Sequence, residues 1–309
     1  MSQHAIVVTA SDQAFVPFVE EALESLLQTR CSEIAAIGLL DLGLDAEQKS
    51  KFENRGVRVV KPDASVTAHL APLINTGQAF ACVARLDVRD YFPGFEVYVW
   101  FDADAWVQSP EFLGAFIAGA RARGAAVARE NGVGYRFSNI ERRWWYGNML
   151  ALYGRFLGTY LCIRSSINIG VLAIDATAPH WLLWKKRVWE AVERVKRLDI
   201  EQHAFFATFY FDHLDVQFMP ARFNWICTLS TPVWDADRGL FCVPGKRQDP
   251  ISVLHLAGPA KTREYNVATR AGATVKTQLT LAGARRLRSR GSMAASSESA
   301  NTPAFDVKI

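Results

Sequence analysis

Short apolar runs alternate with segments of helical periodicity through the first half of the chain. The runs typical of buried strands are residues 5–10, 34–40, 57–60, 97–101 and 125–128. Apolar spacing and polar composition predict helices at residues 15–27, 46–55, 79–86 and 110–123. For the last of these, Ser109 is the expected N-cap and Pro110 the first helical residue. Alternating strands and helices predict an α/β domain with a central, mostly parallel sheet flanked by helices.

The second half is less regular. Strands are expected at residues 167–174, 216–219 and 251–256, and helices at 179–198 and 201–211. Helical spacing in the long helix assigns six side chains to the core: Trp181, Leu182, Leu183, Trp184, Val188 and Val192. Trp144-Trp145-Tyr146 lies among glycines and is expected to be irregular, either a platform for a sugar or a buried aromatic loop.

The expected domain spans residues 1–275. Residues 276–309 are expected to form a tail that is first basic, then Ser/Ala-rich and partly disordered. The basic stretch has two interpretations, peripheral contact with an anionic membrane or a solvated end.

Composition narrows the class of protein. The chain has 309 residues, of which 50% are hydrophobic and 21% charged, as in soluble globular proteins. A net charge of +4 with dispersed basic residues argues against nucleic-acid binding. The five cysteines include no Cys-x-x-Cys pair, which predicts buried free thiols in a reducing cytosol. No signal peptide or membrane-spanning run is visible, so the expected location is cytoplasmic, with peripheral attachment at the inner membrane face through the tail as the variant.

The candidate chemistry begins where the 97–101 run ends. Asp102 and Asp104 are two residues apart in an extended chain, so their carboxylates point the same way. Two such carboxylates repel unless a proton or cation lies between them, and hard oxygen ligands favour Mg²⁺ or Mn²⁺. A second Asp-Ala-Asp, Asp235 to Asp237, follows Pro232 and is expected to be a solvated turn.

A late segment supplies complementary groups. His255 ends the strand expected at 251–256, and Gly258 and Lys261 follow at intervals of three. An imidazole can complete a Mn²⁺ sphere begun by two carboxylates. A lysine can neutralise a diphosphate leaving group.

Four blocks in this order resemble the retaining glycosyltransferases of family eight, the group of glycogenin and bacterial lipopolysaccharide galactosyltransferases. The blocks are Ser11-Asp12 with Phe15; Arg85-Leu86 with Tyr91 to Asp104; Asn168 to Val171 with Glu201-Gln202; and Phe223-Asn224 with His255 to Lys261. The resemblance implies the GT-A fold of nucleotide-diphospho-sugar transferases.

The resemblance also implies roles. Asp102, Asp104 and His255 would bind Mn²⁺ (or Mg²⁺). The donor, a UDP-sugar, would be held by Ala10, Ser11, Asp12, Phe15, Arg85, Asp102, Ala103, Gly258 and Lys261. The groups implied near the reacting carbon are Asn168, Glu201 and Gln202. Retention would proceed by same-face attack or through a covalent intermediate.

The leading hypothesis is therefore metal-dependent transfer of a sugar from a nucleotide-diphosphate sugar to a carbohydrate, glycolipid or protein acceptor. A sugar-phosphate nucleotidyltransferase is the nearest enzymatic alternative, although it would favour a Gly- and Lys/Arg-rich loop after the first strand. A non-catalytic nucleotide-sugar-binding protein is the other alternative. Phosphodiester hydrolysis is weaker, because few further carboxylates and histidines are present for a two-metal site.

Overall fold

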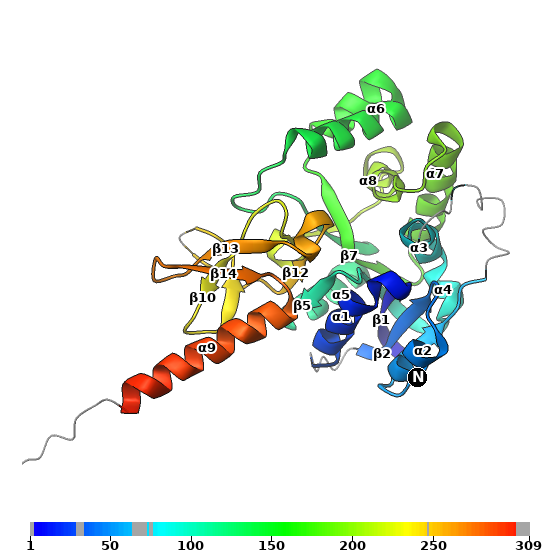
Figure 1. Cartoon of the computed structure of the whole chain (residues 1–309). Helices are drawn as coiled ribbons and strands as arrows, with labels where there is room; N and C mark the ends of the chain where they lie inside the picture. The colour runs from blue at the N-terminus through cyan, green and yellow to red at the C-terminus, as the bar shows by residue number, and fades with distance from the viewer. Residues whose placement is uncertain (1–2, 29–33, 64–72, 74–76, 246, 301–309) are drawn as a thin grey trace, which may run out of the picture.

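A seven-stranded sheet organises the protein (Figure 1). A computed structural model describes residues 3–28, 34–63, 73, 77–245 and 247–300. The strands follow the order β3-β2-β1-β4-β7-β6-β8. Their bounds are β1 Gln3–Ser11, β2 Ile34–Asp41, β3 Arg58–Val60, β4 Phe95–Phe101, β6 Ala125–Arg129, β7 Ile167–Asp175 and β8 Gln217–Met219. Strand β7 is antiparallel to β4 and β6, whereas the other neighbours are parallel, which confirms the mostly parallel sheet.

Both faces of the sheet are buried, because its central strands carry apolar residues on both faces. In β4, Tyr98 and Trp100 contribute to the core on one face. Val97, Val99 and Phe101 contribute to the core on the opposite face. This alternation follows from the two-residue period of a strand. It explains why an unbroken apolar run gives a central strand here.

Helices cover the two faces. One face is covered by α1 Val16–Gln28, α2 Ala46–Glu53 and α5 Glu111–Arg123. The other is covered by α3 Gly77–Ala84, α4 Val88–Tyr91, α6 Asn139–Cys162, α7 His180–Val195 and α8 Glu201–Phe211. Two short 3-10 turns adjoin them, η1 Gln13–Phe15 and η3 Arg85–Asp87. None of the helices in the described ranges is both long and apolar enough to cross a bilayer.

A third apolar cluster lies beside the main sheet (Figure 1). Its elements are β5 Ala105–Val107, η4 Ala221–Phe223, β9 Trp225–Ile226, β10 Val233–Asp235, β11 Leu240–Cys242, β12 Val253–His255, η5 Gly258–Lys261, β13 Glu264–Ala268, β14 Thr274–Gln278 and α9 Leu281–Ala300. The expectation that regular structure fades near Lys276 is wrong. Strand β14 pairs with β13, and Leu281, Ala284 and Leu287 bury their side chains in this cluster.

Three local expectations are also corrected. Trp144 to Tyr146 is helical, because it lies within α6, whose N-terminus is fixed by a capping box between Ser138 and Glu141. Helix α5 begins at Glu111, and Pro110 is the N-cap residue, without a side-chain cap. In α7, Leu182 is 72% exposed and so lies outside the core.

The cysteines partly match expectation. Cys82, Cys227 and Cys242 are buried and Cys162 is partly buried, all as free thiols. Cys31 lies outside the described residues.

Candidate functional site

The Asp102-Ala103-Asp104 turn connects β4 to β5 and is fixed by backbone hydrogen bonds. The Asp102 N–H donates to the carbonyl of Gly170 at 2.8 Å. Strand β12 pairs antiparallel with β5 and brings His255 opposite Ala105. The Leu256 N–H then donates to the Asp104 carbonyl at 2.8 Å. Pairing between two three-residue strands therefore places the histidine beside both carboxylates.

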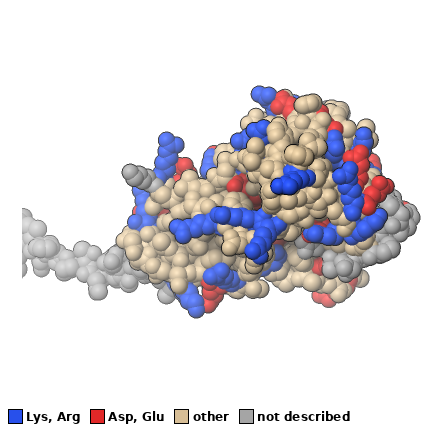
Figure 2. All heavy atoms as spheres, turned by 90° about the horizontal axis from the view of Figure 1, so that it is seen from above, with Lys and Arg blue, Asp and Glu red and all other residues tan. Residues whose placement is uncertain are grey.

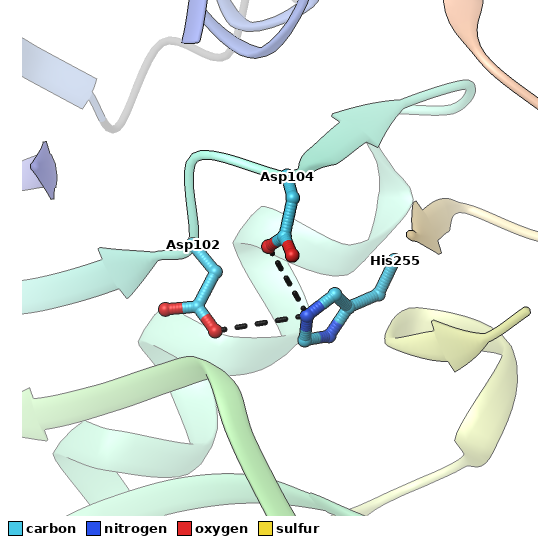
Figure 3. A group of neighbouring side chains, drawn as sticks. All are labelled: Asp102, Asp104 and His255. Atoms are coloured by element: carbon cyan, nitrogen blue, oxygen red, sulfur yellow. Dashed lines mark ion pairs between the residues drawn. The ribbon is translucent and has the colours of Figure 1, made fainter. Parts of the chain in front are cut away.

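The three side chains converge on one point (Figure 3). His255 Nε2 lies 3.3 Å from Asp104 Oδ1 and 3.7 Å from Asp102 Oδ2. One possible ligand atom from each residue lies within 4.8 Å of the others. Two carboxylate oxygens and an imidazole nitrogen are a donor set that suits Mn²⁺ and related divalent ions.

The histidine is oriented by a chain of amides. Asn224 Nδ2 donates to Asn168 Oδ1 at 2.9 Å, which turns Asn224 Oδ1 toward His255 Nδ1, 3.1 Å away. Since that oxygen only accepts, Nδ1 carries the proton and Nε2 faces the carboxylates. Fixing one ring nitrogen in this way is how proteins orient a metal-binding histidine.

The carboxylates of Asp102 and Asp104 favour positive charge beside them. Burial opposes ionisation of Asp104, but His255 and Lys261 outweigh it and lower the pKa of this carboxyl group. Burial likewise opposes protonation of His255, yet Asp104 and Asp102 together raise its pKa. The carboxylates thus stabilise positive charge at the imidazole, and a divalent cation would supply the same charge. Donor types, orientation and charge all fit a divalent metal ion.

The carboxylates line a cavity of about 180 Å³ at the ends of β1 and β4. The predicted site residues in its wall are Ala10, Ser11, Asp12, Phe15, Arg85, Asp102, Ala103, Asp104, Asn168, Glu201, Gln202 and Lys261. Gly258 lies elsewhere, in the wall of a second cavity of about 870 Å³. Asn168 lines both cavities, so the two adjoin at this residue.

Lys261 and the β1 end form one side of the first cavity. Lys261 Nζ lies 2.5 Å from Asp104 Oδ2 and 5.6 Å from the centre of the Phe15 ring. Asp12 accepts a hydrogen bond from the Phe15 N–H at 3.1 Å and so fixes the turn after β1. A cation and an aromatic ring therefore lie together near the carboxylates.

Arg85 forms another part of the wall of the first cavity. Its guanidinium lies 3.4 Å from Asp102 Oδ1 and 3.9 Å from Glu201 Oε1, and it stacks over Trp100 at 4.6 Å. The carboxylate of Asp87, two residues further along the chain, is bound by Lys185. Burial raises the pKa of Glu201 despite the opposing effect of Arg85. The arginine therefore links the metal-site carboxylate to the start of α8.

Gln202 lines the first cavity, and Asn168 lies where the two cavities adjoin. Gln202 Oε1 accepts a hydrogen bond from the Ile169 N–H at 3.2 Å. Asn168 Nδ2 donates to Glu130 Oε1 at 3.4 Å. Burial raises the pKa of Glu130 to about 7. Both amides are thus held by neighbours that line or adjoin the cavities.

Four contributors were not assigned a role from the sequence. Trp100 Nε1 donates to Asp102 Oδ1 at 2.6 Å, and Asn224 orients the histidine. Gly170 leaves room for the imidazole, and Glu130 holds Asn168. The only available signal was proximity to the recognised motifs for Trp100, Gly170 and Asn224, whereas Glu130 had none.

The second Asp-Ala-Asp is structural. Asp235 is fully buried and accepts hydrogen bonds from Arg238 Nε at 2.7 Å and Arg270 Nη1 at 3.2 Å. Asp237 is exposed. The expectation of a solvated turn is therefore wrong for Asp235, whose carboxylate stabilises the turn between β10 and β11.

No family model matches the chain, and no curated protein matches its sequence. Solved glycosyltransferase structures do resemble it. The galactosyltransferase LgtC, in complex with donor and acceptor sugar analogues, has a TM-score of 0.56 at 16% identity, over 93% of this chain and 95% of that chain. The bifunctional glycosyltransferase WbbM gives 0.55 at 13% identity, over 84% and 46%. GlyE from Streptococcus pneumoniae gives 0.53 at 16% identity, over 99% and 66%. This likeness confirms the predicted GT-A fold.

Proposed function

We propose that this protein is a metal-dependent glycosyltransferase that uses a nucleotide-diphosphate sugar, a UDP-sugar, as donor. One observation carries the proposal. The wall of the cavity at the ends of β1 and β4 contains two carboxylates of a three-ligand metal set together with the Lys261 ammonium and the Phe15 ring, and the buried His255 supplies the third ligand. Ligands of open α/β sheets bind at the carboxyl ends of strands, which is where this cavity lies.

Different residues of the site bind the metal ion, the diphosphate and the base. Asp102, Asp104 and His255 hold Mn²⁺ (or Mg²⁺), which when bound supplies Lewis-acid stabilisation of charge on the diphosphate. Lys261 is already positioned beside Asp104, so it stabilises developing negative charge without reorganisation. Ala10, Ser11, Asp12 and Phe15 surround the base, and Ala103 lies between the ligand carboxylates.

The sugar lies toward Asn168, Glu201 and Gln202. All three residues line the first cavity, and Asn168 also lines the second. The second cavity takes the acceptor, so the two substrates meet beside Asn168. Gln202 and Asn168 orient the donor sugar, and Arg85 holds Glu201 in place. The sugar is transferred with retention of configuration to a carbohydrate, glycolipid or protein acceptor.

The nucleotidyltransferase alternative fits less well. A triphosphate site would favour a cationic, glycine-rich loop after β1, whereas the chain has Asp12 and the 3-10 turn Gln13–Phe15. A non-catalytic nucleotide-sugar-binding protein would have the same site as the enzyme, and would differ only in that it does not convert the bound donor.

The test is thermal unfolding with UDP-, GDP-, ADP- and TDP-sugars, with and without Mn²⁺. We expect a rise in Tm that needs both Mn²⁺ and the UDP-sugar, and that disappears in Asp104→Asn. Asp237→Asn, the exposed residue of the other Asp-Ala-Asp, is the matched control and should respond like the wild type. Release of UDP from the stabilising donor then separates catalysis from binding alone. A response to no nucleotide with Mn²⁺ would refute the proposal.

A further inference from the structure

Helix α6 folds back on itself and forms one surface of the molecule. Gly154 has a φ of 74°, outside the helical region, and separates the helix into two arms. The arms touch, since a Cβ added at Gly158 would lie 2.5 Å from the Met149 carbonyl oxygen. The hydroxyl groups of Tyr146 and Thr159 lie 3.4 Å apart across the same junction. In Figure 1, α6 lies at the outer end of the molecule, beyond α7 and α8.

This surface is unusually apolar for exposed protein. Seven of the ten exposed large apolar side chains in the described ranges fall between residues 140 and 163. They are Ile140, Trp144, Tyr146, Phe156, Leu157, Tyr160 and Ile163. Phe156 is 89% exposed, and Tyr160 and Ile163 follow it at helical spacing. Contiguous exposed apolar groups of this kind mark an interaction surface.

The same surface is basic. Residues 139–164 contain four arginines, Arg142, Arg143, Arg155 and Arg164, and one acidic residue, Glu141. Glu141 belongs to the capping box of α6. Arg143 and Arg155 are exposed and form no ion pair with an acidic residue among the described residues. Figure 2 shows this side of the molecule, where lysine and arginine side chains interrupt a largely uncharged surface.

We propose that this α6 surface, the exposed face of residues 139–164, binds an anionic lipid bilayer. Exposed aromatic and aliphatic groups next to arginines match the interface between headgroups and acyl chains. Four arginines against one glutamate match a negatively charged surface. A second copy of the chain is a poorer occupant, because two such surfaces would bring like charges together.

The basic C-terminal stretch is less suited to binding a membrane, because two of its arginines contact other parts of the protein. Arg285 binds Glu24 at 2.6 Å, and Arg288 Nε donates to the Gly239 carbonyl at 2.8 Å. Arg286 and Arg290 are the basic residues of α9 that remain for a membrane.

Docking through α6 has a consequence for the second cavity. Arg142, Trp144 and Trp145 of this helix line that cavity. A bilayer against α6 therefore lies next to the proposed acceptor site, which suits an acceptor carried on a lipid. This consequence rests on the proposed function, whereas bilayer binding itself does not.

The test is co-sedimentation of the full chain with phosphatidylcholine vesicles, with and without phosphatidylglycerol. We expect binding that requires phosphatidylglycerol and weakens with salt. Phe156→Ser combined with Leu157→Ser should reduce partitioning at least tenfold, and Arg143→Glu with Arg155→Glu should do the same. Leu182→Ser, an equally exposed apolar residue on α7, is the matched control and should bind like the wild type.

Three results would overturn the proposal. The first is no binding of the wild type to anionic vesicles. The second is binding that survives both α6 variants but is lost in Arg286→Glu with Arg290→Glu. The third is a wild-type dimer, measured by light scattering, that becomes monomeric in the Phe156 variant while vesicle binding is absent. Cooperative thermal unfolding of the same variants without donor shows that they fold, so this test does not depend on the outcome at the donor site.

Discussion

Replacing Gly170 by alanine should disrupt the candidate metal site by a predictable amount. A Cβ at this position would lie 2.3 Å from His255 Cε1, 2.6 Å from His255 Nδ1 and 2.8 Å from Asn168 Oδ1. Carbon atoms in contact are normally about 3.5–4.0 Å apart, so the imidazole must move by more than about 1 Å. Because His255 is packed between β5 and β9, the movement cannot be small and local.

Two costs combine in this variant. Overpacking a buried site costs about 1–3 kcal/mol. Losing the hydrogen bond between His255 and Asn224 adds about 1 kcal/mol. We therefore expect the free energy of unfolding to fall by about 2–4 kcal/mol and Tm by roughly 3–6 °C. Mn²⁺ affinity should fall about 10–100-fold, as when a group that orients a metal ligand is removed.

The measurements are thermal unfolding with a chelator present and calorimetric titration with Mn²⁺. Gly147→Ala is the control, because a Cβ there meets nothing within 4 Å and alanine favours the helix. In a His255→Ala background, most of the stability cost of Gly170→Ala should disappear, since the clashing ring is gone. Wild-type stability and Mn²⁺ affinity in Gly170→Ala would show that the imidazole is not confined as described.

Three further predictions address other buried charges and the donor. Burial lowers the pKa of His203 to about 3, below its ordinary value. The free energy of unfolding should therefore fall by about 1.4 kcal/mol per pH unit as the pH drops from about 6.5 toward 3. In His203→Phe, the free energy of unfolding measured against pH should change less steeply over this range. Asp235→Ala should lower the free energy of unfolding by about 1–3 kcal/mol while Asp237→Ala changes it by less than about 0.5 kcal/mol, and neither should alter Mn²⁺ binding. Lys261→Met should weaken UDP binding in the presence of Mn²⁺ by about 10–100-fold in calorimetry and leave Mn²⁺ binding alone near its wild-type strength.

The central strands of the main sheet were predictable because each contains an unbroken run of mostly apolar residues. Strand β4 shows the reason, since every residue from Val97 to Phe101 is buried on one face or the other. Strand β5 was not predictable. It has three residues, too few for a period to emerge, and it forms by pairing with β12, which lies within the strand expected at residues 251–256.

The predictions for helix α6 and for the C-terminal elements were wrong for different reasons. In α6, glycines and adjacent tryptophans obscure the period, and the helix turns back at Gly154. Near the C-terminus, the apolar residues that pack α9, Leu281, Ala284 and Leu287, are outnumbered by arginines. Composition indicated a solvated tail there, whereas three spaced apolar residues were sufficient to bury one face of a helix.

The two Asp-Ala-Asp copies show what local sequence leaves open. Both lie at the end of a strand, and in both the first carboxylate accepts a hydrogen bond from a neighbouring side chain, Trp100 in one case and Arg238 in the other. The difference comes from the distant partner. At Asp235, Arg270 adds a second cation and neutralises the carboxylate.

At Asp102 and Asp104, the distant partner is the His255 ring nitrogen, and the carboxylates also line a cavity. The two arginines at Asp235 offer no atom that can bind a metal ion, whereas His255 adds a third ligand atom to the two carboxylates. Because the partner is delivered by strand pairing more than 100 residues away, only the late histidine motif, recognised together with the earlier blocks, could distinguish the two copies from sequence.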